Sequence, residues 1–244
     1  MNCILLPKDA KSIRDPQQIA HIKKILKSKV GDNLTIGEMG GNIGKATIAQ
    51  INHDEVLLTD MILDKQPPAK LDLTVVLALP RPKVLRRLIM DMTSLGVNKL
   101  IVVNSYKSEK SYWQSPLLER IDEFVFEGLQ QAIDTVPLTV EFKKRFKPFV
   151  EDEFPDLLVD EDREQSNAVI AHPYASQSWK TYLEGLEAKI DNMPKVLCIG
   201  AEGGWIDYEV DLLCTHGCTS VSLGERILRT ETVVNVLLGH WLEK

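Results

Sequence analysis

Three features are missing from the 244 residues: a long apolar run, a C-x-x-C pair and a G-x-G-x-x-G motif. A helix needs about 20 consecutive apolar residues to cross a bilayer, so the first absence predicts a cytoplasmic protein with no membrane partner. The absence of a C-x-x-C pair predicts that the cysteines bind no metal. They are instead expected to be small buried thiols in a reducing compartment. The four cysteines are Cys3, Cys198, Cys214 and Cys218. The third disfavours an oxidoreductase that binds a dinucleotide.

Charge is distributed unevenly along a chain whose net charge is −6. Acidic residues concentrate in 151–164, whereas basic residues form three clusters, namely the lysines and arginine of 8–29 (with Lys23 and Lys24), Arg81 to Arg87 (with Lys83), and Lys143 to Lys147. Such asymmetry allows a basic face on an acidic protein, which would suit a nucleic acid. Each run taken alone is more typical of an ordinary solvated helix face than of a nucleic-acid site.

Gln66-Pro67-Pro68-Ala69 marks the predicted domain boundary, because two consecutive prolines exclude a helix and a central strand. The domains are therefore expected to be 1–68 and 69–244. The first should be a small β-barrel with one helix. Its strands are predicted at 2–6, 33–38, 45–51 and 56–62, and the helix stripe is Ile19, Ile22, Ile25 and Leu26.

After the boundary, strand and helix patterns alternate, which predicts an α/β domain with a mostly parallel sheet. Strands are predicted at 71–79, 99–103, 168–171, 196–199 and 219–223. Helices are predicted at 84–95, around 117–129, and at 179–190, 208–215 and 232–242.

Two glycine-containing blocks follow the last two predicted strands, and they are Ile199-Gly200-Ala201-Glu202-Gly203-Gly204 and Leu223 to Thr232. Glycine lets a ligand approach the backbone closely, and in open α/β sheets ligands bind at the carboxyl ends of strands. The sequence therefore predicts a small-molecule site between these blocks.

The two blocks, IGAEGG and LGERILRTET, resemble the signature of the SPOUT superfamily of knotted RNA methyltransferases. Within it, the chain is similar to the RsmE-type family, which uses S-adenosyl-L-methionine to methylate N3 of a uridine in small-subunit ribosomal RNA. The usual first block has proline where this chain has Ala201. The family's Gln-Ser-x-Arg element before a Val-Pro pair is here the segment 130–137, which contains no arginine.

The resemblance implies a deep trefoil knot in the last third of the chain, a PUA-like RNA-binding domain at the N-terminus, and a homodimer. It also implies ribosomal RNA or the assembled small subunit as partner. The residues implied to bind the cofactor are His172, Pro173, Ile199, Gly200, Glu202, Gly203, Gly204, Ser222, Leu223, Gly224, Ile227, Leu228, Arg229, Thr230 and Thr232. Contacts with the RNA are expected from Lys23, Lys24, Arg81, Lys83 and Lys107.

Methylation at N3 requires removal of the N3 proton and stabilisation of the negative charge on the uracil oxygens. Arg226, Arg229 and Glu231 are the predicted catalytic residues. Alternatively, Arg229 and Glu231 form a structural ion pair at the last helix, with Thr230 as its N-cap. Glu202 either caps the helix behind its loop or faces the cofactor.

Two other functions remain compatible with the residues. One is a SPOUT methyltransferase with a different RNA target, which the absent arginine favours. The other is a protein that binds the cofactor and RNA but no longer transfers methyl, which the presence of Arg226, Arg229 and Glu231 disfavours.

Overall fold

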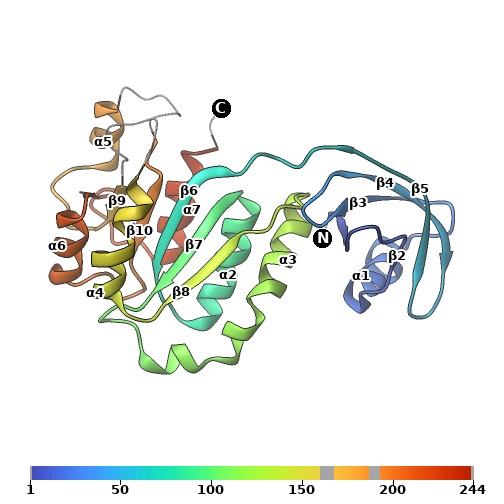
Figure 1. Ribbon diagram of the computed structural model, residues 1–244, viewed down its shortest axis with the longest axis horizontal. Helices are drawn as coiled ribbons and strands as arrows, with labels where there is room; N and C mark the ends of the chain where they lie inside the picture. The colour runs from blue at the N-terminus through green and yellow to red at the C-terminus, as the bar shows by residue number, and fades with distance from the viewer. Residues whose placement is uncertain (1, 160–167, 187–192, 243–244) are drawn as a thin grey trace. The chain divides into compact units, whose positions relative to one another are not determined.

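The computed structural model describes residues 2–159, 168–186 and 193–242, which form two compact units (Figure 1). The N-terminal unit comprises Met1–Lys70 with Met92–Gly96 and Asp122–Pro137, and the C-terminal unit comprises Leu71–Asp91, Val97–Ile121 and Leu138–Lys244. Among the described residues, no helix is both long and apolar enough to cross a membrane.

The N-terminal unit is built on a five-stranded sheet in the order β1-β3-β4-β5-β2. Its strands are β1 (Ile4–Leu6), β2 (Ser12–Ile13), β3 (Asn33–Glu38), β4 (Ile43–Ile51) and β5 (Val56–Lys65). β1 runs parallel to β3, and the other pairs are antiparallel. The unit also holds α1 (Pro16–Ala20), the π-helical turn η1 (His21–Leu26) and α3 (Ile121–Ala132) except its first residue. Alternating apolar side chains of β3 and β4 fill its core, as period-2 patterning predicts.

The predicted helix of this unit is partly wrong. Ile19 and Ile22 are buried, but Ile25 and Leu26 are 68% and 47% exposed. The α-helix gives way to a π-helical turn at His21, so the 3.6-residue period on which the prediction relied no longer holds there. The two-residue strand β2 was not predicted, because two residues carry no periodic signal.

The C-terminal unit contains six parallel strands in the order β11-β9-β10-β6-β7-β8. They are β6 (Leu71–Ala78), β7 (Val97–Val103), β8 (Thr139–Lys143), β9 (Ala168–Ala171), β10 (Val196–Ile199) and β11 (Cys218–Val221). The connecting helices are α2 (Pro82–Ser94), α4 (Phe146–Pro148), α5 (Trp179–Gly185), α6 (Asp207–Thr215) and α7 (Thr230–Gly239), with short turns η2 (Lys110–Gln114), η3 (Pro116–Arg120), η4 (Phe149–Glu153) and η5 (Pro155–Leu158). The predicted parallel α/β architecture is confirmed.

Several predicted boundaries need correction. β8 was not predicted, because its sequence contains glutamate and lysine and runs into a basic cluster, so the alternation of apolar and polar residues is not evident. The helix around 117–129 starts as the 3₁₀ turn η3 and becomes α-helical at Ile121. The last helix covers 230–239 rather than 232–242. The predicted end of the helix at 179–190 lies outside the described residues.

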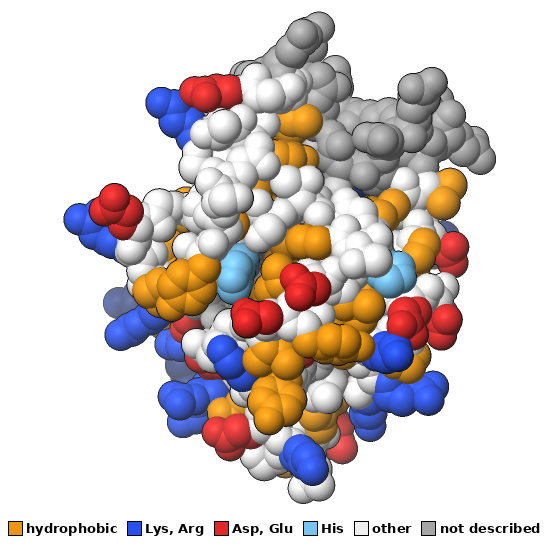
Figure 2. Space-filling view, turned by 90° about the vertical axis from the view of Figure 1, so that its left-hand side faces the viewer, with side chains coloured by type: hydrophobic (Ala, Val, Ile, Leu, Met, Phe, Trp, Pro, Cys, Tyr) orange, Lys and Arg blue, Asp and Glu red, His pale blue; other side chains and the backbone are white. Residues whose placement is uncertain are grey.

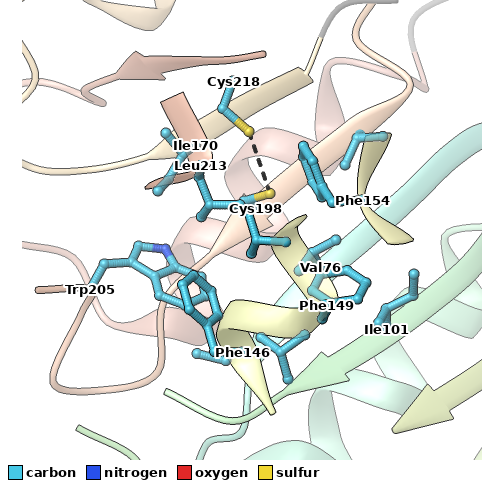
Figure 3. Close-up of a cluster of buried hydrophobic side chains, with 14 of the residues drawn as sticks. Val76, Ile101, Phe146, Phe149, Phe154, Ile170, Cys198, Trp205, Leu213 and Cys218 are labelled. Atoms are coloured by element: carbon cyan, nitrogen blue, oxygen red, sulfur yellow. Dashed lines mark hydrogen bonds between the residues drawn. The ribbon is translucent and has the colours of Figure 1, made fainter. Parts of the chain in front are cut away.

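One face of the parallel sheet is covered by a core of aromatic and aliphatic side chains from α4, η4 and α6 (Figure 3). Within it, the Sγ atoms of Cys198 and Cys218 lie 3.9 Å apart. Their strands flank β9, so their backbones are roughly 9–10 Å apart, beyond the reach of a disulfide. Burial is confirmed for these two cysteines and for Cys3, whereas Cys214 is partly exposed. Burial raises the pKa of the Cys3 thiol to about 11.

Candidate functional site

Three loops meet at one edge of the parallel sheet. They follow β9, β10 and β11, which are neighbours in the order β11-β9-β10, so their carboxyl ends point the same way. The loops begin at His172, Gly200 and Ser222. This is the edge at which open α/β sheets bind ligands, and the predicted site blocks lie on it.

Two adjoining hollows open between these loops, with volumes of about 190 Å³ and about 60 Å³. Gly203 lines the larger hollow and Gly224 the smaller. They share a wall made by Ala171, His172, Pro173, Ile227, Leu228 and Val233. The two glycine blocks therefore surround one continuous region rather than separate parts of the unit.

The loop after β10 is tight enough to need its glycines. A Cβ on Gly200 would lie 2.9 Å from the Cα of Gly204, which is closer than side chains tolerate. Gly204 has φ +67°, and its N–H donates to the Ala201 carbonyl at 2.8 Å. Ala201, where the resembled family has proline, is 6% exposed and closes the same turn.

Lys107 lies over this loop and binds it. Its Nζ donates to the Gly203 carbonyl at 2.7 Å, and a Cβ on Gly203 would lie 2.9 Å from the Cβ of Lys107. Glu209, which is 3% exposed, holds the neighbouring backbone: its carboxylate accepts the N–H of Tyr106 at 2.8 Å and that of Ile206 at 3.0 Å. A buried carboxylate thus fixes the segment that brings a cation to the rim of the larger hollow.

Glu202 joins the same loop to the segment after β6. Its carboxylate accepts the backbone N–H of Arg81 at 3.1 Å, and Glu202 also lines the larger hollow. A side-chain hydrogen bond with Tyr112 raises the pKa of the Arg81 guanidinium, which stays charged. Glu202 therefore connects loops, and it is not the N-cap of α6, the helix behind its own loop, since that residue is Ile206.

The segment after β11 crosses the hollows and then starts α7. Arg226, which is exposed, lines the smaller hollow. Thr230 is buried, and its hydroxyl donates to the Gly200 carbonyl at 3.3 Å, joining this segment to the β10 loop. Ser222 faces away from the hollows, because its hydroxyl donates to the Gln177 carbonyl at 3.3 Å, just ahead of α5.

Glu231 forms an ion pair with Arg87 of α2 at 2.7 Å, and it lines neither hollow. Arg229 is the N-cap residue of α7, so Thr230 is not. The alternative of an Arg229–Glu231 pair capped by Thr230 is therefore wrong, since α2 supplies the partner of Glu231. Neither Arg229 nor Thr232 lines either of these two hollows.

His172 forms part of the shared wall. Its ring lies edge-on to Tyr174 at 5.6 Å, and its backbone N–H donates to the Val221 carbonyl at 2.9 Å. Burial lowers the pKa of His172, an effect that Asp207 opposes and Lys107 strengthens. The imidazole is therefore biased towards its neutral form beside the hollows.

The residues predicted to contact RNA lie in different parts of the structure. Lys107 and Arg81 lie at the site just described, and Lys83 is exposed at the start of α2. In the N-terminal unit, Lys24 is exposed, whereas Lys23 donates to the carbonyls of the 52–53 turn.

Sequence reasoning missed several wall residues, which are Tyr174, Trp205, Val221 and Val233. Most of them directly adjoin a predicted block, so their place in the sequence was the available signal. The described residues contain no group of three or more His, Cys, Asp or Glu side chains that could hold a metal ion.

Figure 2 shows one face of the molecule on which hydrophobic side chains lie among acidic and basic ones. The basic side chains on this face stand singly or in small groups near its margins. An RNA contact on this face would thus depend on individual cations and exposed apolar groups rather than on a dense basic patch.

Comparison with known proteins agrees with this geometry. Residues 67–242 match the RNA methyltransferase domain, and residues 13–60 match the RNA methyltransferase PUA domain. The chain is 29% identical to the ribosomal RNA small subunit methyltransferase E of Treponema pallidum, over 91% of this chain and 80% of that protein. The corresponding Synechocystis protein is 28% identical, over 91% and 70%.

A structure of the Neisseria gonorrhoeae ribosomal RNA small subunit methyltransferase E bound to S-adenosyl methionine has the same fold. Its TM-score is 0.72, with 18% identity over 98% of this chain and 95% of that one. The match over 67–242 shows that the chain belongs to the RNA methyltransferase family that this domain defines, and the Neisseria structure shares its fold. The predicted resemblance to its RsmE-type members is confirmed by the relatives named above.

Proposed function

We propose that this protein transfers a methyl group from S-adenosyl-L-methionine to N3 of a uridine in small-subunit ribosomal RNA. The observation that carries the proposal is the meeting of three strand-end loops around adjoining hollows, in a chain that matches the RNA methyltransferase domain over 67–242. Its relatives from Treponema pallidum and Synechocystis are named ribosomal RNA small subunit methyltransferases E.

The residues around the hollows suit such a cofactor. Because Gly203 and Gly204 have no side chains, a ligand can approach the backbone closely at the wall of the larger hollow. An adenine edge needs one donor and one acceptor in fixed places, and backbone supplies both without loss of side-chain entropy. His172, Leu223 and Leu228 provide apolar contacts. When bound, the cofactor supplies an electrophilic methyl group.

The chain's own side chains would prepare the uracil. Loss of the N3 proton leaves negative charge on the flanking oxygens, which a nearby cation stabilises. Arg226 lines the smaller hollow and Lys107 the larger, so these two cations are the ones that flank the region. Glu231, at the start of α7, is the carboxylate proposed to accept the N3 proton, and Arg229 beside it is proposed as a further cation for the uracil oxygens.

The proposal includes an organisation for the whole molecule. Residues 1–68 would form a PUA-like RNA-binding domain, and residues 69–244 the catalytic domain with a knotted C-terminal third. Two copies would assemble as a homodimer in the cytoplasm, with free ribosomal RNA or the assembled small subunit as substrate. The exposed apolar side chains of Ile227 and Val236, in and just before α7, support a partner surface near the site.

A methyl-transfer assay tests the proposal. Purified protein is incubated with radiolabelled S-adenosyl-L-methionine in two separate reactions. One reaction contains small ribosomal subunits, and the other contains bulk transfer RNA. Label in the small subunits, recovered as N3-methyluridine, is the expected result. Label only in transfer RNA would indicate a different RNA target. Cofactor binding with no label in either RNA would contradict an active methyltransferase.

A further inference from the structure

Three of the chain's five tyrosines are exposed on the C-terminal unit. The exposed fraction is 80% for Tyr106 and for Tyr174, and 51% for Tyr208. A tyrosine ring is largely apolar, so packing within the chain does not explain why these three rings face solvent. Each belongs to a segment beside the larger hollow at the glycine blocks, and the proposed methyl transfer assigns a role to none of them.

Tyr174 follows the carboxyl end of β9 and lines the larger hollow. Its ring lies edge-on to that of His172, with the centroids 5.6 Å apart and an angle of 74° between the planes. This contact holds the ring beside the hollow, and the large exposed fraction leaves at least one ring face open. Of the described residues that line this hollow, Tyr174 alone is both aromatic and exposed.

Tyr106 and Tyr208 belong to two backbone segments that Glu209 joins. The Glu209 carboxylate accepts the N–H of Tyr106 at 2.8 Å, and Tyr208 directly precedes Glu209 in α6. Tyr106 also directly precedes Lys107, whose Nζ binds the Gly203 carbonyl at the same hollow. Both tyrosines therefore lie near the rim of the hollow that Tyr174 lines.

The proposed reaction requires an unpaired uridine. In a Watson–Crick pair the N3–H of uracil donates to the partner base, so a methyl donor cannot reach N3. An unpaired strand exposes the flat faces of its bases, and aromatic side chains stack on such faces whatever the base. The larger hollow is lined by Glu202 as well as by Lys107, so charge alone would attract RNA only weakly here.

We propose that Tyr106, Tyr174 and Tyr208 form a stacking surface for the unpaired nucleotides around the methylated uridine, with Tyr174 against a base directly next to it. The substrate strand is then single-stranded over several nucleotides. Its flanking bases contribute to binding through their faces, without a requirement for a particular sequence. The inference rests on the proposed function, which places the uridine at the hollows beside the methyl donor.

Fluorescence anisotropy with labelled oligoribonucleotides tests this with the full-length protein. S-adenosyl-L-homocysteine is added, so that the cofactor site is filled and no methyl group is transferred. One oligomer has a central uridine among adenines, a second has abasic nucleotides on both sides of that uridine, and a third is the first oligomer paired with its complement. Wild type should bind the first about tenfold more tightly than the other two.

Tyr174→Ala should weaken binding of the first oligomer about tenfold and leave binding of the abasic oligomer unchanged, because both changes remove the same stacked pair. Tyr174→Phe should bind like wild type, since the ring stacks and the hydroxyl does not. The control is Val159→Ala, at a 76% exposed side chain outside both hollows, and it should change neither affinity. A purely structural role of Tyr174 would weaken both oligomers by the same factor, which would overturn the proposal.

The other two tyrosines should act on bases farther from the uridine. Tyr106→Ala combined with Tyr208→Ala should therefore weaken binding of both unpaired oligomers several-fold. The backbone N–H that Glu209 accepts is retained in this variant, so the fold should be kept, and thermal unfolding checks this. Unchanged affinity of the folded double variant would overturn the three-tyrosine surface.

Kinetics separate this proposal from the proposed function. Tyr174→Ala should raise KM for small ribosomal subunits about tenfold and leave kcat unchanged, because stacking on a neighbouring base is the same in the ground and transition states. Transfer with an unchanged KM, or equal wild-type affinity for the three oligomers, would reject the stacking surface and leave the enzyme assignment intact. Binding that depends on Tyr174 and on the flanking bases, without methyl transfer by wild type, would do the reverse.

Discussion

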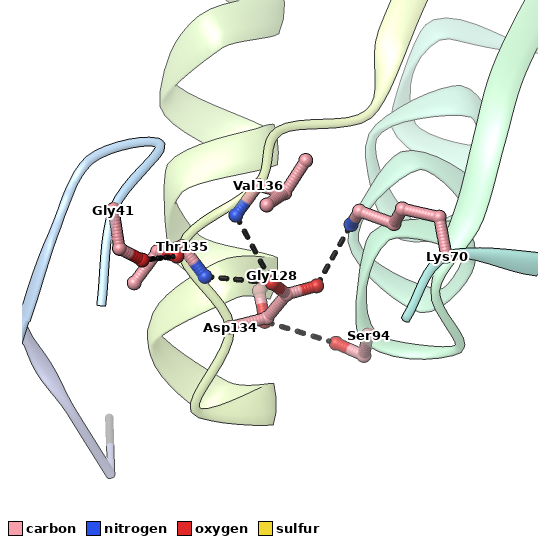
Figure 4. Close-up of polar contacts among 7 residues, drawn as sticks. All are labelled: Gly41, Lys70, Ser94, Gly128, Asp134, Thr135 and Val136. Atoms are coloured by element: carbon pink, nitrogen blue, oxygen red, sulfur yellow. Dashed lines mark hydrogen bonds and ion pairs between the residues drawn. The ribbon is translucent and has the colours of Figure 1, made fainter. Parts of the chain in front are cut away.

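The Nζ of Lys70 lies 2.7 Å from Oδ2 of Asp134, and their side chains are only 12% and 4% exposed (Figure 4). The other carboxylate oxygen of Asp134 accepts the N–H groups of Thr135 and Val136 at 2.7 and 3.0 Å. This is the segment in which the resembled family has an arginine-containing element. In this chain it is a buried junction that ends α3.

Asp134→Ala should lower the free energy of unfolding by about 3–5 kcal/mol, because it leaves the Lys70 ammonium buried without a partner. Urea unfolding measures this. Asp54→Ala, at an exposed turn residue of the same unit, is the control and should stay within about 0.5 kcal/mol of wild type. Equal changes in the free energy of unfolding for the two substitutions would show that the Lys70–Asp134 pair does not stabilise the protein.

Arg226→Ala should lower kcat for methyl transfer by roughly 10²–10³-fold, because a cation beside the hollow is lost where negative charge develops. Folding should be unchanged, since Arg226 is exposed. Glu225→Ala, at the exposed neighbouring residue, should retain the parental rate. Transfer by Arg226→Ala at the wild-type rate would remove Arg226 from the site.

Glu209→Gln should destabilise the protein by about 1–3 kcal/mol, because one charged acceptor for two backbone N–H groups becomes a neutral amide. The loss should also weaken cofactor binding, since Tyr106 adjoins the lysine that holds the Gly203 carbonyl. Calorimetric titration with S-adenosyl-L-methionine checks the second effect. Glu184→Gln, on an exposed glutamate of α5, should alter neither property.

Gly204→Ala should cost about 1–2 kcal/mol of stability, because φ +67° is unfavourable for a residue with a Cβ. No atom lies within 4 Å of the added Cβ, so the cost is conformational rather than steric. Gly185→Ala is the matched control. Gly185 is the last residue of α5, and no atom lies within 4 Å of an added Cβ, so this substitution should be neutral or slightly stabilising. Equal stability of both variants would contradict a required left-handed turn.

The His172 imidazole should titrate below its ordinary pKa of 6.5, because burial disfavours its charged form. The unfolded chain then binds more protons than the folded one, so stability falls as pH drops from about 6.5 through the folded pKa. His172→Gln should make this acid limb shallower. NMR titration of the ring gives the pKa directly, and a value at or above 6.5 would refute the expectation.

Hydrophobic period and glycine position were sufficient to predict much of the C-terminal unit. Val196 to Ile199 is a continuous apolar run that breaks at Gly200, and a strand buried on both faces requires that pattern. The two glycine blocks lie together because their strands share one sheet, a fact that follows once the strands are known to be parallel.

Side-chain partners from distant segments were beyond the sequence. Arg87 and Glu231 are 144 residues apart, so nothing local indicates that α2 neutralises the start of α7. Likewise, Glu209 has the spacing of an ordinary helix-cap glutamate, and its second role for Tyr106 arises only in three dimensions. The exposure of Ile25 results from a π-helical turn, and no residue type in the sequence predicts such a turn.

The backbone ahead of β1 is completed by residues far along the chain. The N–H groups of Asn2 and Cys3 both donate to the Gln130 carbonyl, and Gly40 donates to the Thr135 carbonyl. A gene fragment ending at Pro68 would therefore leave the N–H groups of Asn2 and Cys3 without this acceptor, next to the edge strand β1. Unpaired backbone groups at a sheet edge recruit other chains, so such a fragment would self-associate. Expressing it together with a peptide of residues 122–137 would keep it monomeric.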